Sequence, residues 1–194
     1  GNDYYETEVS LEELIDIIQN LGFTLGLTRD LKEAMGQVLK FVCQIEGIHA
    51  GCVYIVDPLT EGLKLGLKRG LLSSYSGSMD FHDFASQQTR LVMIGKQIYS
   101  NHPKIDIAIP PVDIGPEGVL SCQAIIPMSY NGQVIAALIL YARKRATLIA
   151  SVRNTLEAIG SRMASIIARV RAIDALRESE SKYRLLLETM NEGF

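Results

Sequence analysis

Residues 121–142 contain the sequence feature that most constrains the fold. Two apolar runs, SCQAIIPMSY and QVIAALILYA, flank the dipeptide Asn131-Gly132. Asn-Gly is the strongest short-range signal for a type I′ turn, which joins two neighbouring antiparallel strands. The pattern therefore predicts a β-hairpin with strands at residues 121–130 and 133–142, and with it an antiparallel sheet.

The segments before this hairpin supply further strands and helices. The run AGCVYIVD at residues 50–57 is continuously apolar, which is typical of a strand buried on both faces. Apolar residues at helical spacing predict helices as well. This order of elements predicts an α+β domain, in which helices flank an antiparallel sheet of about five to six strands. The other predicted strands are residues 63–71 and 97–100, and the predicted helices are residues 10–27, 29–46 and 78–94.

The last segment, residues 147–190, has no proline and a single glycine, Gly160. It is predicted to form one very long helix or two nearly continuous ones. Eight apolar residues alternate at spacings of three and four, which predicts a coiled-coil seam and a parallel homodimer. The alternative is that the first turns pack on the domain's own sheet. The predicted seam consists of Ile149, Val152, Leu156, Ile159, Met163, Ile166, Val170 and Ile173.

Composition excludes several classes of function. The net charge of −3 and the lack of a basic run exclude a nucleic-acid-binding surface. The longest apolar run, residues 134–142, is far shorter than the roughly 20 residues that span a bilayer, so no membrane contact is expected. The polar first residues are unlike a secretory signal, which predicts a cytoplasmic location. The cysteines Cys43, Cys52 and Cys122 form no CxxC pair and are predicted to be reduced core thiols, and no metal site is predicted.

Two stretches of the chain resemble the GAF domain family. LKEAMGQVLKFVCQIEGIHAGCVYIVDP (31–58) is similar to its amino half, and GVLSCQAIIPMSYNGQVIAALILYARKR (118–145) to its carboxyl half. In addition, ALRESESKYRLLLETMNEGF (175–194) resembles the entry to a PAS domain. The expected organisation is a disordered or expression-derived start at 1–9, a GAF core at 10–148, a helical linker at 149–182 and the start of a PAS domain at 183–194.

The resemblance implies a regulatory domain without catalytic residues. GAF–PAS tandems resemble the sensory halves of histidine kinases and, less often, of diguanylate cyclases. The resemblance to GAF domains also implies a small-molecule pocket between the sheet and the segments that cover it. In this chain the covering segments are residues 73–94 and 101–118. The expected lining residues are Tyr54, Phe81, His82, Phe84, Arg90, Tyr99 and Cys122.

The ligand is not defined by the sequence. A bilin needs a reactive cysteine in the covering region, whereas Cys122 lies on a predicted strand, and the Asn-Lys-x-Asp constellation of cyclic-nucleotide GAF domains is missing. Neither ligand is therefore expected. Two other functions stay open: a dimerisation scaffold without a ligand, and an enzyme similar to the free methionine-R-sulfoxide reductases, which use three cysteines. A cavity filled by Tyr54, Phe81 and Phe84 would favour the scaffold.

Overall fold

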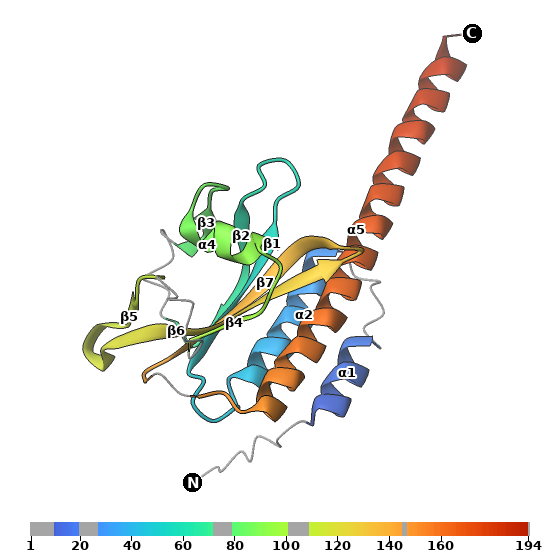
Figure 1. Ribbon diagram of the computed structural model, residues 1–194. Helices are drawn as coiled ribbons and strands as arrows, with labels where there is room; N and C mark the ends of the chain where they lie inside the picture. The colour runs from blue at the N-terminus through green and yellow to red at the C-terminus, as the bar shows by residue number, and fades with distance from the viewer. Residues whose placement is uncertain (1–9, 20–26, 72–78, 101–108, 145–146, 194) are drawn as a thin grey trace.

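The computed structural model describes residues 10–19, 27–71, 79–100, 109–144 and 147–193. Its strands form one antiparallel sheet in the order β3-β2-β1-β7-β6-β4, so the predicted α+β class is confirmed (Figure 1). A short strand, β5, pairs with β6 outside this path. The strands are β1 (Ala50–Val56), β2 (Leu63–Arg69), β3 (Phe81–His82), β4 (Ile98–Tyr99), β5 (Val112–Asp113), β6 (Val119–Tyr130) and β7 (Gln133–Ala142).

The helices lie on both sides of this sheet. Three of them pack into the core on one face, and α4 covers the other face (Figure 1). The residues 20–26 of the first predicted helix, and the residues 73–78 and 101–108 of the predicted covering segments, lie outside the described part of the chain. The helices are α1 (Leu11–Gln19), α2 (Leu27–Val42), α4 (Gln87–Met93), α5 (Ala150–Glu192) and the 3₁₀ turn η2 (Gly115–Glu117).

The helix predicted at residues 78–94 is wrong from Asp80 to Ser86. Phe81 and His82 instead pair with β2, where His82 lies opposite Leu63. The helix begins only after Ser86, whose hydroxyl accepts a hydrogen bond from the Thr89 amide at 3.2 Å. An N-cap serine of this kind satisfies an amide that has no partner within the helix, and so fixes where the helix begins.

The hairpin predicted from Asn131-Gly132 is confirmed. Tyr130 pairs with Gln133, and the two turn residues have φ values of 50° and 78°. A type I′ turn requires positive φ at both central positions, which asparagine and glycine tolerate. Further along β6 the register shifts at Gln123, the extra residue of a β-bulge.

Alternate residues of β7 face two separate apolar layers. Leu138 and Leu140 belong to the layer under α1, α2 and α5, whereas Ala137, Ile139 and Tyr141 belong to the layer on the opposite face. The period of two along a strand produces this division. Any shift of this strand therefore affects both layers at once.

The long predicted helix is confirmed as α5, which belongs to the domain over its first half and projects beyond it over the second (Figure 1). Its residue Gly160 allows close approach to β6, because a Cβ atom there would lie 3.0 Å from Ile126 Cγ2. Five of the eight predicted seam residues are buried in the chain's own core. Ile149 is 62% exposed, while Val152 and Ile173 are half-buried. The buried residues are Leu156, Ile159, Met163, Ile166 and Val170.

Candidate functional site

A cavity of about 330 Å³ lies on the sheet face opposite α1, α2 and α5. Its walls come from β3, α4, the residues around β5, and β7. The volume is at the lower end of the roughly 300–1,000 Å³ that small-molecule sites occupy. The lining residues are Met79, His82, Gln88, Ile109, Pro110, Pro111, Val112, Asp113 and Tyr141.

Tyr54 does not line the cavity, but it forms a polar contact with the lining residue His82. The Tyr54 hydroxyl donates to the Met79 carbonyl at 3.0 Å, and His82 Nε2 lies 3.4 Å from the same hydroxyl oxygen. Because the phenol has one proton, and Met79 accepts it, we infer that His82 Nε2 carries a hydrogen and donates to Tyr54. The second ring nitrogen, Nδ1, is then an acceptor.

Burial keeps both rings uncharged near neutral pH. Burial raises the pKa of Tyr54 far above its usual value, with smaller contributions from Cys52 and Asp80. Burial also lowers the pKa of His82, and the nearby Asp83 carboxylate offsets part of that effect. Since desolvation penalises the charged form of each group, this part of the site favours contacts between uncharged groups.

The other predicted lining residues are dispersed. Cys122 is buried in the same apolar layer but does not line the cavity. Phe81 and Phe84 are largely exposed, the latter at 67%, so they do not fill the cavity. Arg90 is exposed and donates to the Ala85 carbonyl from Nε at 2.9 Å.

Tyr99 lies on the opposite side of the sheet from the cavity. Its ring packs against the α5 layer, its hydroxyl donates to Glu157 at 2.9 Å, and the Arg153 guanidinium lies 5.5 Å from the ring centroid. Its neighbour Ile98 faces the cavity layer instead. Tyr99 is thus a contact between β4 and α5.

Sequence reasoning missed Tyr141, Gln88, Met79 and Asp113 as lining residues. Tyr141 comes from β7, where it alternates with Leu140. The apolar run of β7 gave no indication of which face each residue occupies, because both faces are buried. The strand pairing with β1 would have been needed to assign Tyr141 to the cavity.

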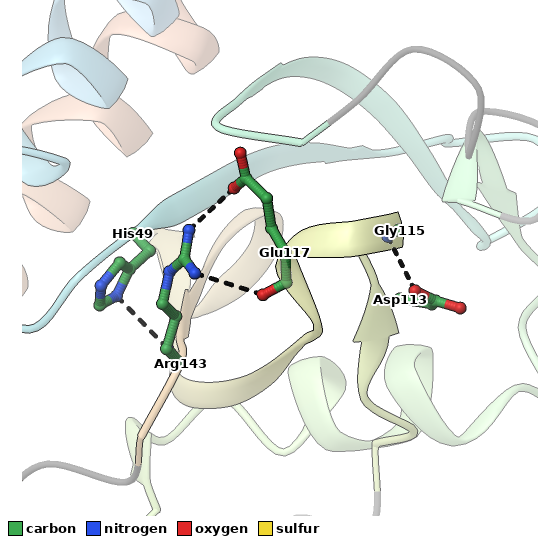
Figure 2. Close-up of polar contacts among 5 residues, drawn as sticks. All are labelled: His49, Asp113, Gly115, Glu117 and Arg143. Atoms are coloured by element: carbon green, nitrogen blue, oxygen red, sulfur yellow. Dashed lines mark hydrogen bonds and ion pairs between the residues drawn. The ribbon is translucent and has the colours of Figure 1, made fainter.

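An ion pair attaches the cavity wall to the end of the sheet (Figure 2). Arg143, directly after β7, donates to the Glu117 carboxylate at 2.8 Å and to its carbonyl at 3.2 Å. The Arg143 amide also donates to His49 Nδ1 at 3.3 Å. Beside this contact, Asp113 accepts a hydrogen bond from the Gly115 amide at 2.8 Å. These contacts hold η2 and the adjoining β5, which lines the cavity.

The cysteines are poorly suited to redox chemistry. Burial raises the pKa of Cys52 and the pKa of Cys122 to about 12 each, and it raises the pKa of the half-buried Cys43. The thiolate is the reactive form of cysteine, so these thiols are poor nucleophiles near neutral pH. All three are free, as the sequence predicts.

The described residues form neither a metal-binding cluster nor a membrane-spanning helix. No group of three or more histidine, cysteine, aspartate or glutamate side chains is placed there to hold a metal ion. Within the same residues, no helix combines the length and apolar character that crossing a bilayer requires.

The sheet, its helical layer and the cavity define the class of protein, an α+β domain with an open antiparallel sheet. The chain belongs to the GAF domain family, whose model matches residues 28–168. A comparison with curated proteins found no match.

Solved structures have the same fold. The GAF domain of an Acinetobacter phosphoenolpyruvate-protein phosphotransferase is 12% identical, with a TM-score of 0.63, over 84% of this chain and 93% of that chain. A domain of a protein described as a two-component sensor histidine kinase, from Sinorhizobium meliloti 1021, is 15% identical, with a TM-score of 0.53. The match covers 75% of this chain and 96% of that chain. A type II free methionine-R-sulfoxide reductase from Thermoplasma acidophilum is 15% identical, with a TM-score of 0.55. The match covers 74% of this chain and 96% of that chain. At these identities the likeness concerns the fold alone.

Proposed function

We propose that this domain is the regulatory input of a signalling protein, and that a small molecule bound in the cavity alters a conformation which α5 transmits. The observation that carries the proposal is the arrangement of the two functional parts on opposite faces of one sheet. Tyr141 lines the cavity, and the adjacent Leu140 packs in the layer that contains α5. Ligand contacts on one face therefore act on the strand that supports the helix on the other.

Strand β1 provides a second connection. Tyr54 contacts His82 at the cavity, and two residues later the Val56 carbonyl accepts a hydrogen bond from the Arg171 guanidinium of α5. Arg171 lies where the buried half of α5 gives way to its exposed half. A displacement of Tyr54 would therefore reach the helix at the point where it leaves the domain.

A thermal-shift screen of this chain against a broad metabolite library tests ligand binding. A ligand that binds the folded state at about 100 times its Kd stabilises it by roughly 2.7 kcal/mol. The variant Val112→Phe places a larger side chain at the cavity and should abolish the shift. Val119→Phe makes the same change at an exposed residue of β6 outside the cavity, and should leave the shift intact. A library without any stabilising compound would instead favour a scaffold that binds no ligand.

We further propose that the projecting half of α5 pairs with the same helix of a second copy. Beyond the domain, apolar residues again alternate at spacings of three and four, with Glu180 occupying one position of the series. Such spacing supports a coiled coil. Because these residues lie on the part of α5 that projects beyond the domain, they are open to a partner, unlike the buried residues of the first half. The residues are Ile173, Leu176, Tyr183, Leu187 and Met190.

Light scattering of this chain tests the pairing. Leu187→Glu places a charge in the proposed seam and should produce monomers. Leu185→Glu is the matched control, because Leu185 is also exposed on α5 but lies outside the series. A monomeric wild type, or equal effects of the two variants, would refute the pairing. Changes at Ile159 or Ile166 are unsuitable, since both are core residues of the domain.

The parent protein is proposed to be a cytoplasmic sensor histidine kinase or, as the second choice, a diguanylate cyclase, with a PAS domain that begins at residues 183–194. The PAS-like residues and the likeness to the Sinorhizobium domain support this proposal. Sequencing of the full-length gene beyond the codon for Phe194 tests it directly. The reductase alternative lacks support from the site, because the Cys52 and Cys122 thiols are buried and protonated.

A further inference from the structure

The cavity wall carries almost no charge. Of its nine described lining residues, Asp113 alone is a charged side chain near neutral pH, and none is lysine or arginine. Asp113 is exposed and already accepts the Gly115 amide hydrogen. An anionic ligand would lose its hydration without gaining a counter-charge from these described residues, which is strongly unfavourable.

A cationic ligand is also disfavoured at this cavity. The Asp113 carboxylate lies in contact with water, where screening weakens ion pairs. On the inner side, burial lowers the pKa of His82, so the same environment already disfavours a positive charge on that ring. The lining therefore selects against both signs of charge.

Tyr141 supplies an unused polar group. Its side chain is only 3% exposed, it lines the cavity, and its hydroxyl forms no hydrogen bond within the described part of the chain. Because Tyr141 lines the cavity, an acceptor on a ligand could receive the hydrogen bond that its hydroxyl otherwise gives to water. Gln88 offers both a donor and an acceptor at the same wall, and His82 retains Nδ1 as an acceptor.

We propose that the cavity binds an uncharged one- or two-ring molecule that carries a carboxamide-like group, which accepts a hydrogen bond from Tyr141. This inference rests on the proposed sensory function and narrows its ligand class. The remaining walls, formed by Met79, Ile109, Pro110 and Val112, would contact the rings. The small volume of about 330 Å³ limits the ligand to this size.

Matched triads of compounds test the charge preference. Indole-3-acetamide, indole-3-acetate and tryptamine share one ring system and differ in charge, and further amide, carboxylate and amine triads extend the panel. Binding to the intact chain is measured by calorimetry at a fixed pH and ionic strength. The amides are expected to bind at least tenfold more tightly than their charged counterparts. Carboxylates or amines that bind as tightly as the amides would overturn the inference and leave the sensory function standing.

The variant Tyr141→Phe tests the hydrogen bond. Loss of one such bond weakens binding of the amides roughly two- to twelvefold. Tyr130→Phe is the control, because it removes the same hydroxyl from an exposed residue outside the cavity. The thermal stability of the ligand-free chain should be unchanged by Tyr141→Phe, since the hydroxyl lacks a partner there. Unchanged amide affinity, or a large loss of ligand-free stability, would overturn the role of Tyr141. No binding by any compound of the panel or of the broad library would refute the sensory function as well.

Discussion

Replacement of Leu156 by alanine tests whether the first half of α5 belongs to the domain core. Leu156 is completely buried, in the layer that α5 shares with α2 and the sheet. Leucine-to-alanine changes at such sites cost about 2.7–5.0 kcal/mol, because both transfer energy and packing are lost. We expect about 3 kcal/mol here, a large part of the roughly 5–15 kcal/mol that stabilises a domain.

Urea unfolding followed by tyrosine fluorescence measures this loss, since the chain has eight tyrosines and no tryptophan. With an m-value of about 2 kcal/mol/M, a loss of 3 kcal/mol lowers the midpoint by about 1.5 M. Leu185→Ala is the control on the same helix. Leu185 is 64% exposed and lies outside the proposed seam, so its replacement should change the free energy of unfolding by less than about 0.5 kcal/mol.

Protein concentration separates a core role of Leu156 from a role in a dimer seam. The neighbours of Leu156 lie in its own chain, so its contribution should not change over a hundredfold range of concentration. A contribution made across a dimer would grow with concentration, as any association does. The reasoning fails if Leu156→Ala costs less than 1 kcal/mol, if the cost depends on concentration, or if Leu185→Ala costs as much.

Three further predictions concern the turn, a buried ring and the thiols. Gly132→Ala should cost about 1–2 kcal/mol in urea unfolding, because alanine is strained at a φ of +78°. The added Cβ meets no atom within 4 Å, so the cost comes from the backbone alone, and an unchanged midpoint would contradict the type I′ turn. Burial lowers the pKa of His82, so the unfolded chain binds a proton first as pH falls below about 6.5, and stability decreases. His82→Gln should therefore lose less stability than the wild type between pH 7 and pH 5. An equal loss in both would contradict a lowered pKa of His82. Iodoacetamide at pH 8 should label Cys43 well before Cys52 or Cys122 in mass spectra of the folded chain, and early labelling of Cys52 would contradict its burial.

Much of the fold could be predicted because its local signals are strong. Asn131-Gly132 permits few turns, and the apolar runs beside it can only be buried strands. The predicted helix at 78–94 was wrong at Phe81 and His82 because their pairing with β2 is a long-range contact. The local sequence of residues 78–94 does not indicate that contact.

The site could be predicted only in part, for a related reason. Of the predicted lining residues, His82 borders the cavity and Tyr54 contacts His82 without lining the cavity, whereas Tyr99 faces α5 and Tyr141 was missed. The face that a strand residue occupies depends on register and bulges, such as the one at Gln123. Likewise, an apolar spacing of three and four is the same whether the helix covers its own sheet or a second chain, so the spacing alone does not assign the buried stretch of α5 to either role.

The uninterrupted course of α5 has a consequence for how such a domain can be joined to others. From Ser161 to Glu192 the helix contains neither glycine nor proline. Each residue inserted after Val170 would turn everything downstream by about 100° and move it by about 1.5 Å. Seven inserted residues nearly restore the original orientation, whereas two turn the output by about 200°, to almost the opposite side. The number of residues in the helix therefore sets the angular relation between this domain and whatever follows it, independently of any contact between the two.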